Sequence, residues 1–395
     1  MPASSLPTGR WVTTWTAMPQ LTEPDNMPPP PYAKEGLSLA DTTLRQTLRV
    51  SLGGERLRLR LSNAFGGAPL PITSVAVALP SGGAAGVSGI RPETSRPVTF
   101  SGRARATVPA GAHVVSDPLE LAVAPGTVLA VTVHLAEGLA SSALTSHPGS
   151  RTTSHLATGD HVHAADLPAA TPVDHWYLLS GVEVEAGADA ATVVLLGDSL
   201  TDGRGSTTNG NDRWPDRLFD RLPPGVAVAN QGAGGNRVLN DGLGPSALAR
   251  LDRDVLAQSA ARWLVVFEGV NDLGTAPATR EAQRQVVEEL IAAYEQIAVR
   301  ARARDLLVYG ATLTPFGGSD PYDDPEGCRE EARQAVNAWI REAGAYDAVI
   351  DFDVAVRDPA APRRLAAAYD EGDHLHLSPA GYRALAEAVP LTLFG

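Results

Sequence analysis

The chain has 395 residues, of which 44% are hydrophobic and 19% charged, and a formal net charge of −13. A chain of this length is too long to fold around one ordinary hydrophobic core, so two domains are expected. The composition is that of a globular protein. No cluster of Lys and Arg supplies the basic face that a nucleic-acid-binding protein needs, so no nucleic-acid partner is expected.

Cys328 is the only cysteine, which excludes an intrachain disulfide and a cysteine-rich metal site. No stretch of about 18 apolar residues occurs, so no membrane span is predicted. The first residues, MPASSLPTGRW, lack the charged and apolar regions of a signal peptide. We therefore expect a cytoplasmic protein if the chain is complete as given, and a secreted protein if a leader was removed. The sequence does not predict the oligomeric state.

Residues 1–188 are predicted to form an all-β domain. In GGERLRLRLSNAFGG, Leu57, Leu59 and Leu61 face one side and the arginines between them face the other, which is the period of a half-buried strand. The Gly-Gly pair before this run suggests a hairpin with the strand that precedes it. Turn residues recur at roughly ten-residue spacing, as in a β-sandwich or jelly roll. We expect a jelly-roll-like sandwich that serves as a substrate-binding accessory.

Three tryptophans of this domain have two interpretations. Trp11, Trp15 and Trp176 carry large flat rings that are suited either to stacking on sugars or to packing in a hydrophobic core. Core packing is the favoured interpretation.

Residues 189–395 are predicted to form an α/β domain, because short apolar runs alternate with helix-like segments. This alternation indicates a parallel sheet that helices cover on both faces. The predicted strands are 192–196, 226–230, 263–268, 305–311 and 348–352. The predicted helices are 212–222, 246–260, 279–301, 326–343 and 379–389.

Four segments of this domain carry polar residues of the kinds used in catalysis. Three of them directly follow predicted strands, and the fourth lies near the end of the chain. They are GDSL (197–200), NQGAGGN (230–236), GVND (269–272) and GDHLH (372–376). Because open α/β sheets bind ligands at the carboxyl ends of their strands, we expect all four segments to lie on one rim.

The residue types in these segments form a chemically complete set. The hydroxyl of Ser199 needs a base to take its proton, and histidine is the usual base. Asp373 and His376 are spaced so that one helical turn would put both side chains on the same face. Donors for an oxyanion would come from the Ser199 amide, a glycine amide of the second segment and the Asn271 side chain. Each segment alone can be explained by a structural role, such as a helix cap or a turn. The occurrence of all four in this order along the chain favours a catalytic site.

The four segments resemble the Ser, Gly, Asn and His blocks of the SGNH (GDSL-type) hydrolases, over about residues 190–392. The resemblance implies a three-layer α/β/α sandwich with a five-stranded parallel sheet. It implies Ser199 as nucleophile, His376 as base and Asp373 as the acid that orients it. It also implies an oxyanion hole of Gly235, Asn271 and the Ser199 amide, with no cofactor and no metal.

The second block leaves one assignment open. The residue before Gly235 is often serine in the family and is Gly234 here, so either glycine could donate to the oxyanion. Gly235 is preferred because Asn236 follows it. Together with the opening WVTTWTAMPQ, the stretch TDGRGSTTNGNDRWPDRL is similar to a bacterial branch of esterases that includes enzymes associated with polysaccharide breakdown.

The sequence therefore predicts a serine carboxylic ester hydrolase that cleaves short acyl esters, acetyl in particular, through a covalent acyl-enzyme. The ester is carried by a small molecule or a glycan, and its identity is open. One alternative is a carbohydrate-binding or scaffolding protein with a relic hydrolase domain. Another is a metal-dependent hydrolase that uses the two His-x-His motifs, GDHVH (159–163) and GDHLH (372–376).

Overall fold

The computed structural model describes residues 9–167 and 169–395, and the chain divides into two compact units. The first unit runs to Ala190 and includes 208–211, and the second contains 191–207 and 212–395. The expectation about a leader rests on residues 1–8 and lies outside the described residues. Among the described residues, none of the helices has the length and apolar character that crossing a bilayer requires.

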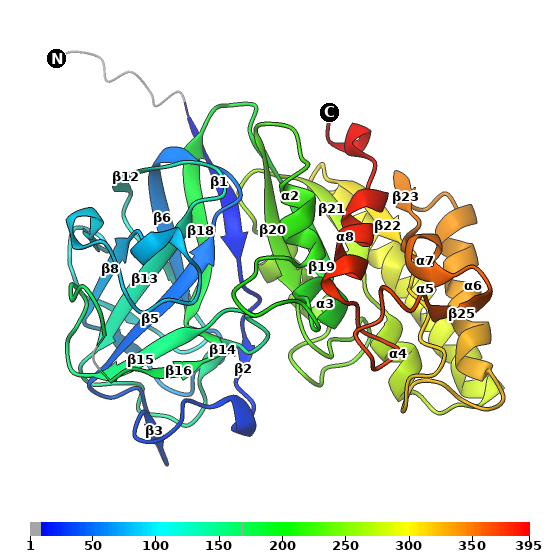
Figure 1. The fold of residues 1–395 in the computed structure, drawn as a ribbon, viewed down its shortest axis with the longest axis horizontal. Helices are drawn as coiled ribbons and strands as arrows, with labels where there is room; N and C mark the ends of the chain where they lie inside the picture. The colour runs from blue at the N-terminus through cyan, green and yellow to red at the C-terminus, as the bar shows by residue number, and fades with distance from the viewer. Residues whose placement is uncertain (1–8, 168) are drawn as a thin grey trace. The chain divides into compact units, whose positions relative to one another are not determined.

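The first unit is all-β, as predicted, and its strands pair antiparallel (Figure 1). One sheet has the path β1 (Arg10–Thr16), β18 (Leu179–Ala186), β6 (Gly54–Ser62) and β11 (His113–Val115), with β12 (Leu119–Val123) also paired to β6. A second sheet has the order β16 (Thr171–Val173), β15 (Ser154–Thr158), β5 (Thr42–Arg49), β13 (Val128–Leu135), β8 (Ser74–Ala78) and β9 (Arg96–Val98). Smaller sheets contain β10 (Ala106–Val108) with β7 (Leu70–Ile72), β17 (Trp176–Tyr177) with β14 (Thr145–His147) and β2 (Gln20–Leu21), and β3 (Ala33–Lys34) with β4 (Leu37–Ser38).

The predicted alternation in β6 is confirmed, but the predicted hairpin is wrong. Leu57, Leu59 and Leu61 are buried, and the arginines between them are partly exposed. However, β5 pairs with β13 and β15, whereas β6 pairs with β18, β11 and β12. The Gly-Gly pair marks where the chain leaves one sheet for another. A turn signal shows where the chain changes direction, and it does not determine which strand becomes the neighbour.

The tryptophans of the first unit mainly pack in its interior. Trp15 and Trp176 are 5% and 2% exposed, and their rings meet edge to face with centroids 4.9 Å apart. Trp11 is partly exposed, and the Arg58 guanidinium lies 4.4 Å from its ring centroid. Core packing is thus confirmed for Trp15 and Trp176.

The second unit contains the predicted five-stranded parallel sheet, in the order β20-β19-β21-β22-β23. The strands are β19 (Ala191–Gly197), β20 (Val226–Gly232), β21 (Ala261–Phe267), β22 (Leu307–Ala311) and β23 (Ala348–Ile350). The helices are α1 (Ser199–Asp202), α2 (Trp214–Phe219), α3 (Ala247–Leu251), α4 (Val270–Thr275), α5 (Arg280–Arg302), α6 (Cys328–Glu342), α7 (Phe352–Val356) and α8 (Pro379–Ala388). A π-helical turn, η4 (Asp252–Leu256), follows α3, and a short hairpin joins β24 (Arg357–Asp358) to β25 (Ala361–Leu365).

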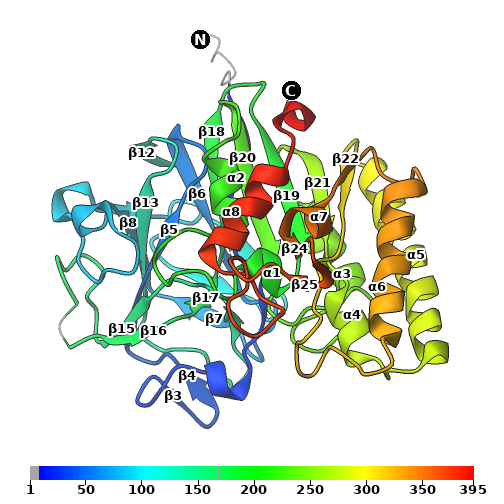
Figure 2. The same ribbon diagram turned by 45° about the vertical axis from the view of Figure 1, so that its right-hand side comes forward.

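Two hydrophobic cores on opposite faces of this sheet explain the three-layer arrangement. Along β19, Val193 and Leu195 pack in one core with α2, α7 and α8. Val194 and Leu196 pack in the other core with α3, α5 and α6. Successive side chains of a strand point to opposite faces, so a continuously apolar strand needs cover on both sides. Figure 2 shows α5 beside α6 and α2 beside α8.

Several short elements of the second unit were not predicted. They are α1, α4, α7 and the β24–β25 hairpin, each too short to show an apolar period.

Three-residue and four-residue 3₁₀ turns occur in both units, at η1 (Pro24–Asn26), η2 (Ser81–Gly83), η3 (Pro92–Thr94) and η5 (Leu391–Phe394).

Candidate active site

Ser199 lies where β19 ends and α1 begins. The Asp198 side chain caps α1 by accepting a hydrogen bond of 2.9 Å from the Leu200 amide. Gly197 leaves no room for a side chain, because a Cβ there would lie 2.2 Å from the Thr201 Oγ1. The sharp change from strand to helix therefore places the serine at the carboxyl end of the central strands, where the sequence analysis expected it.

Ser199, His376 and Asp373 form a continuous chain of hydrogen bonds. The Ser199 Oγ lies 2.8 Å from the His376 Nε2, and the His376 Nδ1 lies 2.6 Å from the Asp373 Oδ2. The other carboxylate oxygen of Asp373 accepts hydrogen bonds from the amides of Leu375 at 3.0 Å and His376 at 2.8 Å. The structure thus brings together a hydroxyl, an imidazole and a carboxylate that come from segments 177 residues apart.

The contact between Asp373 and His376 does not come from a helical turn, so that detail of the sequence analysis is wrong. Residues 373–376 form a bend, and His374 has a positive φ of 62°. The carboxylate reaches the imidazole because it also accepts the backbone amides of the same bend, as short acidic side chains commonly do in turns.

The electrostatics of this pair keep the carboxyl ionised and the imidazole neutral. Partial burial acts to raise the pKa of Asp373, but the hydrogen bonds from His376 outweigh it and lower the pKa to about 2. Burial lowers the pKa of His376, although the neighbouring Asp373 carboxylate opposes this shift. At neutral pH the imidazole can therefore accept a proton from Ser199.

Asn271 is the second residue of α4, directly after β21, and is almost fully buried. Its Nδ2 donates a hydrogen bond of 2.7 Å to the carbonyl oxygen of Asn236. Asn236 follows Gly235, so this bond links the third segment to the second. An amide nitrogen carries two hydrogens, and one of them is therefore left to act as a donor.

The surroundings of Gly234 and Gly235 bear on which glycine donates. The Gly234 amide donates to the Asp202 Oδ2 at 3.1 Å and is therefore already engaged. The Gly235 amide has no hydrogen-bond partner within the described part of the chain, and its φ of 68° favours glycine. The Ser199 amide belongs to the first turn of α1, where backbone N–H groups have no partner inside the helix. The geometry therefore favours Gly235 over Gly234.

Arg250 of α3 is a residue that the sequence analysis missed. Its buried guanidinium donates to the carbonyl oxygens of Gly197 at 3.2 Å and Gln231 at 2.7 Å. It also donates to the Asn236 Oδ1 at 2.9 Å and to the Glu268 carboxylate at 3.4 Å. One side chain thus connects the ends of β19, β20 and β21. An arginine on the apolar side of the predicted helix 246–260 was the available signal.

Three buried carboxyl groups lie beneath the site. Burial raises the pKa of Asp198 to about 7, of Glu268 to about 8 and of Asp272 to about 6. Asp272 also accepts the amides of Val238 at 2.8 Å and Leu239 at 3.0 Å. Asp272 therefore holds the loop after β20 against α4 and has a structural task in the site.

The two His-x-His motifs do not form metal sites within residues 9–167 and 169–395. No group of three or more His, Cys, Asp or Glu side chains there is arranged to hold a metal ion. The His161 Nε2 lies 2.9 Å from the Thr158 carbonyl oxygen, and the His163 Nδ1 lies 3.1 Å from the Ser95 hydroxyl. The His374 Nδ1 pairs with the Asp370 carboxylate at 2.5 Å. Each histidine thus has a nearby partner of its own.

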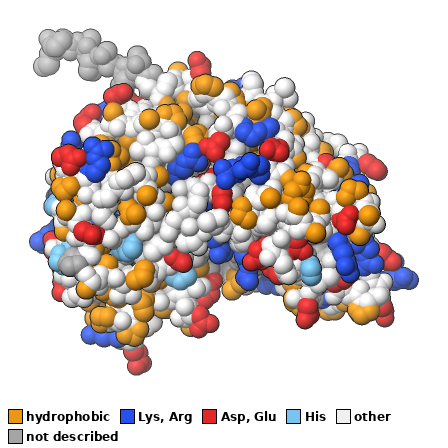
Figure 3. Space-filling view, viewed as in Figure 1, with side chains coloured by type: hydrophobic (Ala, Val, Ile, Leu, Met, Phe, Trp, Pro, Cys, Tyr) orange, Lys and Arg blue, Asp and Glu red, His pale blue; other side chains and the backbone are white. Residues whose placement is uncertain are grey.

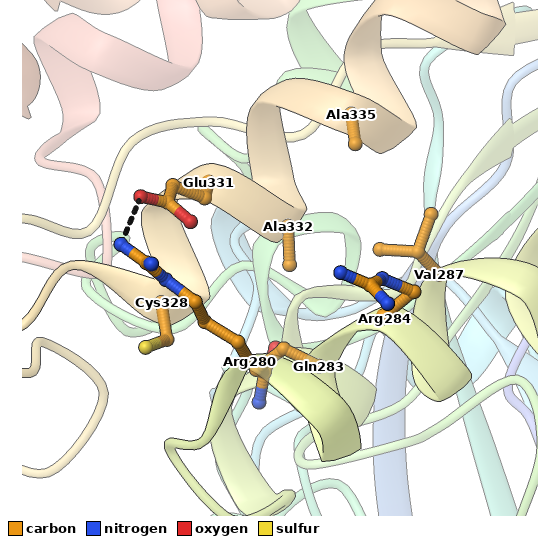
Figure 4. Close-up of a pocket in the computed structure, with 8 residues that line it drawn as sticks. All are labelled: Arg280, Gln283, Arg284, Val287, Cys328, Glu331, Ala332 and Ala335. Atoms are coloured by element: carbon orange, nitrogen blue, oxygen red, sulfur yellow. Dashed lines mark hydrogen bonds and ion pairs between the residues drawn. The ribbon is translucent and has the colours of Figure 1, made fainter.

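A cavity of about 190 Å³ between α5 and α6 contains none of the predicted site residues (Figure 4). Arg280 reaches across it towards Glu331, with 3.5 Å between the charged atoms. Cys328 lines the cavity, and burial raises the pKa of its thiol. A protonated thiol is a poor nucleophile, so Cys328 does not compete with Ser199.

On the face drawn in Figure 3, basic and acidic side chains are interspersed.

Comparison with known proteins bears on the second unit. The model of the GDSL-like lipase/acylhydrolase family matches residues 195–384. None of the curated proteins matches the chain.

Solved structures that resemble the chain cover about half of it. A G-D-S-L family protein from Desulfitobacterium hafniense DCB-2 is 21% identical over 50% of this chain and 97% of its own, with a TM-score of 0.38. A GDSL-like lipase from Bacteroides thetaiotaomicron VPI-5482 is 18% identical over 50% and 84%, with a TM-score of 0.37. The acetyl xylan esterase AlAXEase is 18% identical over 50% and 96%, with a TM-score of 0.36. Residues 195–384, which include all the predicted site residues, therefore match a GDSL-like lipase/acylhydrolase domain.

Proposed function

We propose that the chain is a serine carboxylic ester hydrolase that removes short acyl groups, acetyl in particular, through a covalent acyl-enzyme. The observation that carries this proposal is the hydrogen-bonded series from the Ser199 Oγ through His376 to Asp373. This series is the arrangement that activates a serine hydroxyl as a nucleophile. The restriction to short acyl groups rests on the sequence resemblance, and the substrate panel described below tests it.

In the proposed reaction, the Ser199 Oγ attacks the ester carbonyl carbon while its proton passes to the His376 Nε2. The negative charge that develops on the carbonyl oxygen accepts hydrogen bonds from the amides of Ser199 and Gly235 and from the Asn271 Nδ2. His376 then donates its proton to the departing alkoxide, leaving the acyl group on Ser199. Water that gives a proton to the same imidazole attacks this acyl-enzyme, and the bond from the acyl carbon to the Ser199 Oγ then breaks as His376 returns the proton to that oxygen and the acid is released. Asp373 holds the imidazole in the required tautomer throughout.

A serine-directed phosphonate tests the nucleophile directly. We expect loss of activity in proportion to phosphorus incorporated, and peptide mapping should find the adduct on Ser199. Incubation with EDTA should leave the activity unchanged. Full activity after complete phosphonate treatment, or loss of activity in EDTA alone, would contradict the proposal and favour a metal-dependent hydrolase.

The acyl group and the alcohol are tested with a substrate panel. It contains nitrophenyl esters of increasing chain length, acetylated xylan and acetylated monosaccharides. We expect kcat/KM to be highest for acetate and to fall as the acyl chain lengthens. Acetate released from xylan but not from small esters would favour a glycan substrate and support a substrate-binding role for the first unit. A preference for long acyl chains would overturn the short-acyl part of the proposal.

Replacing Asn271 by alanine should cost about 3 kcal/mol in the transition state, which is about a 10²-fold loss of kcat, because an oxyanion donor is removed. KM for nitrophenyl acetate should change little, since the ground-state carbonyl oxygen carries less charge. Steady-state kinetics beside thermal unfolding curves would measure both effects. An unchanged kcat would remove Asn271 from the oxyanion hole.

The pH dependence of kcat/KM should reflect the lowered pKa of His376. Only the neutral imidazole accepts the serine proton, so a lowered pKa keeps the enzyme active to lower pH. We therefore expect the acid limb to lie below the ordinary histidine value of 6.5. Asp198, whose pKa is raised by burial to about 7, is another group near the site that titrates in this pH range. Asp198→Asn keeps a good helix cap and should leave the limb in place. If the acid limb of kcat/KM lies above pH 6.5 in the wild type and disappears in Asp198→Asn, the limb belongs to Asp198 and not to His376.

A further inference from the structure

The side-chain amide of Asn271 is held at both ends. A backbone carbonyl can only accept a hydrogen bond, so the end that faces the Asn236 carbonyl oxygen at 2.7 Å must be the nitrogen. The opposite end is therefore the oxygen, and it lies 2.6 Å from the hydroxyl of Tyr322. Because this oxygen has no hydrogen to give, the tyrosine hydroxyl must be the donor.

Tyr322 lies in the segment between β22 and α6, and its ring is packed against the helix that carries Asn271. A Cβ on Gly274 of α4 would lie 2.5 Å from two atoms of this ring, so the glycine allows the ring to approach closely. On another side the ring meets Phe316 edge to face, with centroids 6.3 Å apart. The hydroxyl position is thus fixed by packing as well as by its hydrogen bond.

Arg329 of α6 fastens the same segment to the end of α4. Its guanidinium donates to the carbonyl oxygen of Pro321 at 3.0 Å and to that of Ala276, which follows α4, at 2.9 Å. The residue before Tyr322 and the end of the helix of Asn271 are therefore held by one planar group. This arrangement keeps the distance between the tyrosine hydroxyl and the asparagine amide short.

The orientation of an asparagine amide decides whether it helps or hinders the proposed reaction. With its nitrogen directed to the developing oxyanion it donates a hydrogen bond, whereas after a 180° flip its oxygen would repel the same charge. A hydrogen bond to the amide oxygen also polarises the amide and strengthens its N–H donors. Burial raises the pKa of Tyr322 to about 12, so the hydroxyl keeps its proton at neutral pH.

We propose that Tyr322 is a positioning residue of the oxyanion hole, whose hydroxyl holds the Asn271 amide with one Nδ2 hydrogen directed towards the developing oxyanion. The inference rests on the proposed function, because it assigns a task to the partner of Asn271 in that reaction. Tyr322 itself touches Asn271 and not the reacting atoms, so its effect on the rate passes through the amide.

Tyr322→Phe tests this inference with a minimal change, since it removes the hydroxyl and keeps the ring. We expect kcat for nitrophenyl acetate to fall about 10-fold with little change in KM, the scale of one buried hydrogen bond. Tyr309→Phe is the matched control, because the Tyr309 hydroxyl also donates a 2.6 Å bond, to the Leu393 carbonyl oxygen. This control should lose comparable thermal stability and keep its kcat.

A double-mutant cycle separates positioning from general destabilisation. In the Asn271→Ala background, Tyr322→Phe should have no further effect on kcat, because the amide that it orients is gone. The same 10-fold loss in both backgrounds would overturn the inference. A second readout is the affinity for methylboronic acid, which forms a tetrahedral adduct with an active serine. Its inhibition constant should rise in Tyr322→Phe by about the factor lost in kcat.

The outcomes also distinguish this inference from the proposed function. Wild-type kcat in Tyr322→Phe, together with the expected losses in Ser199→Ala and Asn271→Ala, would reject the role of Tyr322 and leave the esterase standing. A wild-type protein that hydrolyses no ester of the panel and binds no boronate would reject the proposed function, and the inference about Tyr322 would fall with it.

Discussion

Replacing Ser199 by alanine is expected to lower kcat for nitrophenyl acetate at least about 10³-fold, the scale seen when a member of a catalytic triad is deleted. In the proposed reaction, the Ser199 hydroxyl is the protein group that forms a covalent bond to the substrate. The fold should survive, because α1 is capped by the Asp198 side chain and not by Ser199. The hydroxyl contributes one hydrogen bond, to His376, which is about 1 kcal/mol of stability.

The measurement is steady-state kcat beside a thermal unfolding curve for the same preparation. Ser206→Ala provides a matched control, since Ser206 lies in the turn that follows α1 and has no part in the proposed chemistry. The control should keep wild-type kcat. Near-normal turnover by Ser199→Ala would be incompatible with a serine nucleophile at this position.

Asp373→Asn should lower kcat by about 10³- to 10⁴-fold for a different reason. The carboxylate accepts a hydrogen bond from the His376 Nδ1–H, and this keeps the Nε2 unprotonated and free to take the serine proton. An amide nitrogen at the same place would donate to the Nδ1 and force the hydrogen onto the Nε2. The imidazole would then be in the wrong tautomer to act as a base, although the geometry would be nearly unchanged.

The chain supplies a matched control for this variant. Asp370 pairs with His374 much as Asp373 pairs with His376, only a few residues away. Asp370→Asn should therefore leave kcat almost unchanged. A large loss in Asp370→Asn with a small loss in Asp373→Asn would mean that the functional histidine has been assigned to the wrong pair.

The sequence predicted much of the second unit because its signals are local and strong. Five apolar runs became the five strands of the parallel sheet, and the polar residues after them had to lie at one edge. This rule accounts for Ser199 and Asn271, which follow β19 and β21, but not for His376, whose segment follows none of the five strands. The family resemblance added the roles of the individual residues.

Other features depend on packing that no short segment encodes. Tyr322 lies in a stretch without any apolar period, and its hydroxyl meets Asn271 only because α4 leaves room at Gly274. The hairpin expected before β6 was wrong for a similar reason, since the partner of a strand is chosen by the whole sheet. The bend at 373–376 replaced the expected helical turn because Asp373 accepts backbone amides of that bend.

The guanidinium of Arg250 has a consequence for how this site can change during evolution. Its rigid fork of donors reaches acceptors in β19 and β20 and the Glu268 carboxylate after β21 at once, a task that the single ammonium of lysine could not perform. The buried residue that holds the strand ends together is therefore different from the exposed residues around the site. Leu243, which lies against Gly235 and is 51% exposed, belongs to these exposed residues. If the proposed function holds, substitutions there would change which ester fits while Ser199 and His376 keep their alignment.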